Sequence, residues 1–150
     1  MSQTTELEAV RETEPESSTE AVATSAARAP AITWFEIPAL DYEATVAFYE
    51  ALLETKLQRV IDPEMGRYAK FAGLDEGTQG CVAPAEHHRP GSDGTVVYLW
   101  CGLDLDTVLT RAWNLGAKVV VPKRMLPHGI GAVAQIIDPQ GNRVGLHARR

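Results

Sequence analysis

The sequence predicts an α+β fold built from two tandem β-α-β-β-β modules, and three observations predict it. Short apolar runs accompany one helical pattern in each half of the chain. The whole pattern restarts after the polar loop at residues 86–93. Helix caps recur at a fixed spacing, since Asp41 and Asp104 are 63 residues apart. Strand starts follow almost the same spacing, since Lys56 and Lys118 are 62 residues apart. Recurrence of this kind indicates a duplicated supersecondary unit.

The first module is expected to span about residues 31–86. Its opening strand, near residues 32–37, is apolar and is stopped by Pro38. Asp41 is a favourable N-cap for a helix near residues 41–54, in which apolar residues recur at helical spacing. Those residues are Tyr42, Val46, Tyr49 and Leu53. Three further strands are expected at residues 56–61, 67–72 and 80–83.

The second module is expected to span about residues 94–148. A strand at residues 95–101 precedes a helix that begins at Asp104 and ends before Gly116. Three strands follow, at residues 118–121, 130–137 and 142–147. The last two are joined by Asp138-Pro-Gln-Gly-Asn142, whose proline and glycine are typical of a tight turn.

Composition limits the possible partners and compartment. The 150 residues are 45% hydrophobic and 23% charged, which is ordinary for one globular domain, here residues 31–150. The net charge of −6 and the absence of a basic patch argue against nucleic acid. Residues 1–30 carry six glutamates against two arginines and few large apolar side chains, so we expect a disordered acidic tail. The longest uncharged stretch, 125–137, is too short to span a membrane.

The two cysteines and the start of the chain indicate a cytoplasmic protein. Cys81 and Cys101 lie in apolar runs and lack the spacing of a metal site, so we expect two unpaired thiols in a reducing compartment. The first residues are acidic and contain no apolar run, so they do not resemble a signal peptide.

Four motifs together resemble the vicinal oxygen chelate superfamily, which includes glyoxalase, extradiol dioxygenase and bleomycin-resistance protein. They are Trp34-Phe-Glu-Ile-Pro38, Asp41 followed by Val46-Ala-Phe-Tyr49, Gly94-Thr-Val-Val-Tyr-Leu99, and the closing Asp138-Pro-Gln-Gly-Asn142. The resemblance covers about residues 31–148. It implies two half-open sheets that form an open β-groove, commonly completed by a second chain. We therefore expect a homodimer.

The metal site of that superfamily is not expected here. The resemblance places the ligand positions on the first and fourth strands of each module, at Trp34, Ala83, Val97 and Gly145. None of these side chains is a suitable ligand for a divalent metal. A shift of two residues, which keeps the same strand face, supplies only Glu36 and His147 as donors. The sequence therefore predicts a groove without a metal or other cofactor.

The remaining polar candidates are histidines and one glutamate. His87, His88 and His128 fall in predicted loops, and we expect solvated side chains there. Glu36 and His147 are expected to point into the groove, one from each module. There they are either an acid/base pair or a structural, ligand-orienting pair, because a buried carboxylate needs a partner in both cases.

The favoured function is the binding of a small apolar or aromatic molecule in a metal-free groove, as in bleomycin-resistance proteins. The expected ligand-binding residues are Trp34, Glu36, Val97, Leu99, Gly145 and His147. The alternative is a metal-independent isomerase or lyase in which Glu36 and His147 are the catalytic acid and base. A metal-dependent enzyme of the glyoxalase or dioxygenase type is less favoured, because it requires ligands that the sequence lacks.

Overall fold

The computed structural model describes residues 31–72 and 78–150, so the predicted acidic tail lies outside the described residues. The first module contains β1 (Trp34–Ala39), α1 (Tyr42–Leu53), β2 (Gln58–Asp62), β3 (Gly66–Lys70) and β4 (Gln79–Pro84). The second contains β5 (Tyr98–Trp100), α2 (Leu105–Asn114), β6 (Lys118–Leu126), the 3-10 turn η1 (Pro127–Gly129), β7 (Gly131–Ile137) and β8 (Arg143–Ala148).

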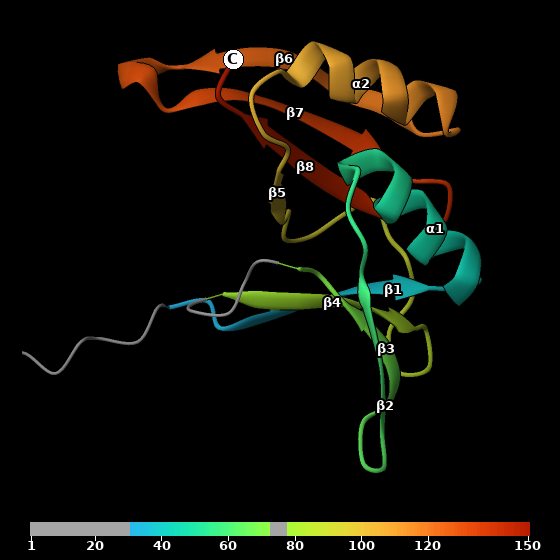
Figure 1. Cartoon of the computed structure of the whole chain (residues 1–150). Helices are drawn as coiled ribbons and strands as arrows, with labels where there is room; N and C mark the ends of the chain where they lie inside the picture. The colour runs from blue at the N-terminus through green and yellow to red at the C-terminus, as the bar shows by residue number, and fades with distance from the viewer. Residues whose placement is uncertain (1–30, 73–77) are drawn as a thin grey trace, which may run out of the picture.

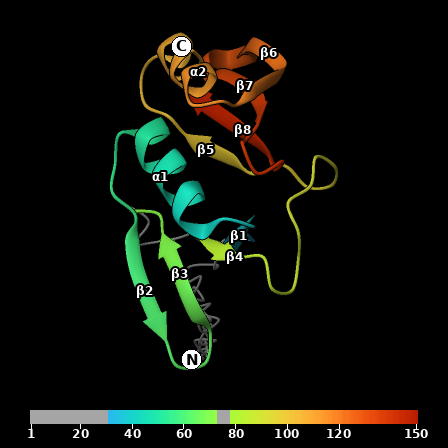
Figure 2. The same ribbon diagram turned by 90° about the vertical axis from the view of Figure 1, so that its right-hand side faces the viewer.

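The two modules have the same topology. Each forms a four-stranded sheet, with strand orders β1-β4-β3-β2 and β5-β8-β7-β6. The first and fourth strands of each module are parallel, and the other pairs are antiparallel. The views in Figures 1 and 2 both show α1 between the first sheet and the second module. The predicted α+β fold of two β-α-β-β-β modules is confirmed.

Each helix begins at the predicted aspartate and buries its apolar side. The Asp41 carboxylate accepts a hydrogen bond from the Ala44 backbone N–H at 3.0 Å, which caps α1. Asp104 precedes α2, but its carboxylate accepts from the Thr107 hydroxyl at 2.6 Å rather than from a helix N–H. Buried residues of both helices belong to one hydrophobic cluster with the sheets, so the two modules share a core.

The β7–β8 turn joins the second module to the first. Asp138 is buried, and its carboxylate accepts a hydrogen bond from the Tyr49 hydroxyl of α1 at 2.7 Å. The Asn142 amide donates to that carboxylate at 2.9 Å and to the Pro38 carbonyl at 3.0 Å. Burial, together with the Asp138 charge, holds the pKa of Tyr49 well above its usual value. The turn that ends the sequence pattern is therefore also a contact between modules.

The face of each sheet that lies away from its helix is partly exposed, and we call it the open face. In the first sheet it carries Trp34, Glu36, Tyr68, Cys81 and Ala83. In the second sheet it carries Tyr98, Trp100, Gln135, Gly145 and His147. Among residues 31–72 and 78–150, no helix is both long enough and apolar enough to cross a membrane.

Candidate functional site

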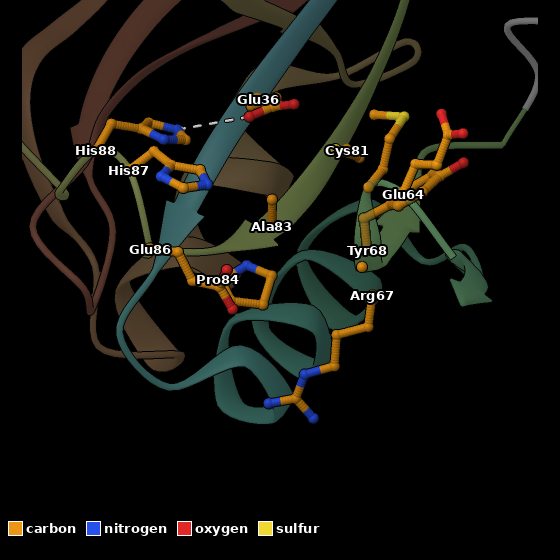
Figure 3. Close-up of a pocket in the computed structure, with 12 residues that line it drawn as sticks. Glu36, Glu64, Arg67, Tyr68, Cys81, Ala83, Pro84, Glu86, His87 and His88 are labelled. Carbon is orange, nitrogen blue, oxygen red and sulfur yellow. Dashed lines mark ion pairs between the residues drawn. The ribbon is translucent and has the colours of Figure 1, made fainter. Parts of the chain in front are cut away.

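A cavity of about 250 Å³ lies on the open face of the first sheet (Figure 3). Side chains from β1, β3 and β4 form its floor, and the β2–β3 turn and the segment after β4 form its rim. The residues used below are Glu36, Tyr68, Cys81, Ala83, His87 and His88. The cavity has room because β4 contributes the small side chains of Cys81 and Ala83 to its floor.

Glu36 is the polar centre of this cavity. Trp34 and Glu36 are two residues apart on β1, so strand alternation places them on one face. The Trp34 indole N–H donates a hydrogen bond to Glu36 Oε1 at 3.2 Å. Glu36 Oε2 lies 3.9 Å from His88 Nε2, as the dashed line in Figure 3 shows. The carboxylate is therefore held by an indole on one side and faces an imidazole on the other.

Tyr68 supplies an aromatic wall that the sequence did not reveal. Its ring meets the Trp34 ring edge to face, with centroids 6.0 Å apart and planes at 83°. Tyr68 comes from β3, which reaches the cavity because β3 pairs with β4. A tyrosine in a short amphipathic strand carries no signal of its own, so only the fold reveals this pairing.

Cys81 lies on the cavity floor opposite Glu36 in the β1–β4 pair. Burial, together with the nearby Glu36 charge, raises the pKa of the Cys81 thiol to about 12. A thiol with so high a pKa stays protonated at neutral pH and is a poor nucleophile. Cys81 is therefore part of the floor and not a reactive group.

Aromatic side chains occupy the open face of the second sheet. The Tyr98 ring lies across Gly145, where a Cβ atom would overlap it. The Gln135 amide donates to the Tyr98 hydroxyl at 2.7 Å and holds the ring in place. The Trp100 ring meets the His147 ring edge to face, with centroids 5.2 Å apart. The region above Gly145 is therefore filled by Tyr98.

The strand face expected for Val97 and Leu99 is wrong. Leu99 is buried in the core, and Val97 packs against the core as well, so neither lines the open face. Tyr98 and Trp100 occupy that face instead. The expected face was carried back from the helix cap, but Gly102, with φ of 86°, bends the connection before that cap. A shift of one residue moves every side chain of a strand to the other face.

Glu36 and His147, the expected pair, are not in contact. Within residues 31–72 and 78–150, no hydrogen bond or ion pair joins them. His147 Nε2 instead lies 2.9 Å from the Ile130 carbonyl oxygen, and its ring packs against Trp100. The imidazole beside Glu36 belongs to His88, and its neighbour His87 also lines the cavity. Both were expected to be solvated loop residues, because their loop has no periodicity from which its position could be read.

The side chains do not fit a metal at the superfamily positions. In the described part of the chain, no group of three or more His, Cys, Asp or Glu side chains is arranged to hold a metal ion. Trp34 and Ala83 of the first sheet and Gly145 of the second have no suitable donor atom. Val97, the fourth position, faces the core. A function without metal remains a prediction that needs a direct measurement.

Comparison with known proteins identifies the fold. No protein-family model matches the sequence, and no curated protein matches it. Solved structures do match. A glyoxalase/bleomycin resistance protein from Streptomyces sp. CB03234 is 24% identical with a TM-score of 0.57, over 77% of this chain and 98% of that one. A member of the glyoxalase/bleomycin resistance protein/dioxygenase superfamily from Sphaerobacter thermophilus DSM 20745 is 23% identical with a TM-score of 0.56, over 78% and 95%.

A third match has a described binding function. TnmS3, an antibiotic binding protein from Streptomyces sp. CB03234, is 23% identical with a TM-score of 0.53, over 78% of this chain and 93% of that one. Identities this low establish the fold alone, and the agreement covers nearly the whole length of each of these three matched chains. The resemblance drawn from the sequence motifs is confirmed at that level: this chain has the fold of the glyoxalase/bleomycin resistance/dioxygenase, or vicinal oxygen chelate, superfamily.

Proposed function

We propose that the protein binds a small aromatic or apolar molecule in the cavity on the open face of the first sheet, without a metal. The observation that carries this proposal is the combination of a cavity, an aromatic wall and one fixed carboxylate. Tyr68 lines the cavity, and Trp34 stands beside it. The Glu36 carboxylate, held by the Trp34 indole, supplies a polar anchor. Small-molecule sites usually combine apolar walls with a few placed polar groups.

The structural relatives support this proposal in kind. TnmS3 is described as an antibiotic binding protein, which shows that the fold can serve as a binder. The genomically encoded FosX of Listeria monocytogenes, 16% identical with a TM-score of 0.52, is described as a fosfomycin resistance protein. These functions belong to those proteins. For this chain they make a binding function a reasonable first test.

The other expected binding residues, Gly145 and His147, lie on the second sheet, and we propose that they contribute to an assembled form. The second module exposes several large apolar side chains: Tyr98, Trp100, Val119, Val120, Met125 and Ile130. Exposed apolar surface of this extent favours association. We propose a homodimer, which light scattering would detect as twice the chain mass. The free thiols of Cys81 and Cys101 support the proposal of a reducing compartment such as the cytoplasm.

A metal-independent enzyme is the second candidate, and one contact favours it. A carboxylate and an imidazole that face one cavity can act as acid and base. The structure offers Glu36 with His88, whose Oε2 and Nε2 atoms are 3.9 Å apart, in place of the expected Glu36 with His147. In an enzyme, Glu36→Gln should abolish turnover and retain binding. In a binder it should change affinity alone.

The proposed binding is tested by ligand screening followed by substitution of Trp34. A thermal-shift screen of small aromatic compounds identifies a ligand, since a molecule that prefers the native state raises the melting temperature. Trp34→Ala should then weaken binding by roughly 1–3 kcal/mol, the cost of losing a central aromatic anchor. Trp113→Ala is the matched control, because Trp113 is an exposed tryptophan of α2 away from the cavity. Equal affinity in wild type and Trp34→Ala would move the ligand elsewhere.

A further inference from the structure

We propose that the ligand of this cavity is an organic cation with a planar aromatic body. This inference rests on the proposed binding function and adds the charge of the ligand to it. The cavity and its aromatic wall define the site, and the charged groups around it determine which class of aromatic molecule it prefers. Three observations carry the argument: the sign of the lining charges, the free acceptor capacity of Glu36, and the aromatic rings beside it.

The lining charges are mostly negative. Three glutamates line the cavity, Glu36, Glu64 and Glu86, and one arginine, Arg67. No ion pair to a described residue neutralises Glu64 or Glu86. The Arg67 guanidinium is directed to the other side, where it lies 4.7 Å from the centre of the Tyr42 ring. In Figure 3 its side chain extends away from the cavity.

Two further groups bear on the charge of the site. Lys70 lies on the same sheet face, opposite Cys81 in the β3–β4 pair, but it is not among the cavity-lining residues. His87 and His88 add positive charge only when they are protonated. With neutral histidines, the cavity therefore presents a negative potential, which favours a cation and opposes an anion.

Glu36 can accept more hydrogen bonds than the protein gives it. Its Oε1 accepts one bond, from the Trp34 indole N–H. Its Oε2 lies 3.9 Å from His88 Nε2, which is beyond hydrogen-bond distance. A carboxylate has about four acceptor sites, so an ammonium or amidinium group can bind at Oε2 without displacing Trp34. Such a charge-assisted bond is stronger than one between neutral groups.

The aromatic rings favour the same class of ligand. Trp34 and Tyr68 are nearly perpendicular, so they form two walls of a corner next to the Glu36 carboxylate. The face of an aromatic ring attracts a cation, and tryptophan does so most strongly. The same faces stack against a planar aromatic body. A molecule that carries both a ring and a positive charge satisfies all three groups at once.

The test uses three probes of one shape and different charge: naphthalen-1-ylmethylammonium, 1-naphthalenemethanol and 1-naphthoate. Dissociation constants are measured by tryptophan fluorescence titration on the full chain at neutral pH, with melting temperature as a second readout. We expect the cation to bind about tenfold or more tightly than the alcohol, and the anion to bind most weakly. Raising the salt concentration should reduce this preference, because screening weakens charge attraction.

Two variants locate the effect. Glu36→Gln keeps the shape and removes the charge, so it should abolish the preference for the cation over the alcohol. Glu43→Gln is the control, because Glu43 is an exposed glutamate of α1 outside the cavity and the charge change is the same. It should leave the preference intact. Equal loss in both variants would mean nonspecific attraction to an acidic chain and would overturn the assignment to this cavity.

The probes separate the two proposals. Binding of the alcohol or the anion as tight as that of the cation would overturn the charge inference and leave small-molecule binding in place. No fluorescence change and no rise in melting temperature with any probe at millimolar concentration would overturn both. A cation preference that persists in Glu36→Gln would also overturn the inference, since Glu36 is its stated centre.

Discussion

Each module places an aromatic ring of its first strand across a glycine of its fourth strand, but the two rings lie on opposite faces of their sheets. Phe35 covers Gly80 on the side that packs into the core, next to Phe71. Tyr98 covers Gly145 on the open face of the second sheet. Phe35 and Tyr98 are 63 residues apart, the spacing of the helix caps. Equivalent positions of the sequence repeat therefore have different structural roles.

This difference explains why only the first sheet offers the cavity described above. With Phe35 turned inward, the open face next to β1 keeps the small side chains of Cys81 and Ala83, and space remains above them. With Tyr98 turned outward, the ring fills the corresponding region above Gly145. Duplication thus preserved the topology, while a change of strand face decided which module holds a site.

The largest expected effect is at the turn that connects the modules. Asp138→Ala removes an acceptor for the Tyr49 hydroxyl, the Asn142 amide and two backbone N–H groups, and leaves buried donors unpaired. We expect a loss of about 3 kcal/mol or more in the free energy of unfolding, because each unpaired buried polar group costs about 1–3 kcal/mol. Urea denaturation followed by tryptophan fluorescence measures this loss. If the modules depend on this contact, both should unfold at lower urea concentration.

Asp93→Ala is the matched control for that experiment. Asp93 is an exposed loop aspartate. The same substitution there should change stability by less than about 0.5 kcal/mol. An equal, small effect in both variants would contradict the structural role given to Asp138.

The next effect is at the two glycines, and it tests the comparison directly. Gly80→Ala should cost about 2–3 kcal/mol, because Phe35 is fixed against Phe71 and cannot move aside. Gly145→Ala should cost about 1 kcal/mol, because Tyr98 is 44% exposed and can turn into solvent. Denaturation midpoints in urea measure both values.

One control and one double variant complete this test. Gly91→Ala should be close to neutral, because a Cβ atom there meets nothing within 4 Å. The double variant Tyr98→Ala with Gly145→Ala should be about as stable as Tyr98→Ala alone, since the clash has been removed. A larger cost at Gly145 than at Gly80 would show that the Tyr98 ring is as fixed as the Phe35 ring.

The sequence revealed most of the fold because its signals are local. Asp41 and the periodic residues after it predict α1, and Asp138-Pro-Gln-Gly-Asn142 predicts the β7–β8 turn. The shared face of Trp34 and Glu36 also follows from strand alternation alone, and the structure places both on the open face. These features depend on a few neighbouring residues, so they can be read without knowing what packs against them.

The rest of the candidate site could not be read in this way. The approach of His88 to Glu36 depends on the path of an irregular loop, which has no periodic pattern. Tyr68 reaches the cavity through pairing between strands that are separated in sequence. The face of β5 was misassigned because β5 has only three residues and Gly102 interrupts the count from the helix. A strand this short offers too few alternations to fix its register independently.

The smallest expected effect compares the two thiols, one from each module. Burial raises the pKa of Cys81 to about 12, and burial raises that of Cys101 to about 11. At pH 8 the thiolate is the reactive form, so both should be alkylated by iodoacetamide far more slowly than a free cysteine. Cys101 should react about tenfold or more faster than Cys81, because its pKa is lower and because Cys81 is almost completely buried.

The pH dependence of this reaction has a definite sign. Both thiols have a folded-state pKa above their ordinary value of 9.0, so the folded chain retains protons that the unfolded chain has lost. The stability from this source is present below about pH 9 and is lost as pH rises through 11 and 12. Mass spectrometry of labelled peptides follows the alkylation from pH 7 to pH 10, and Cys81→Ser and Cys101→Ser assign each rate. Fast labelling of Cys81 at pH 8 would show that the cavity floor opens to solvent, and the first module would then be the less rigid of the two.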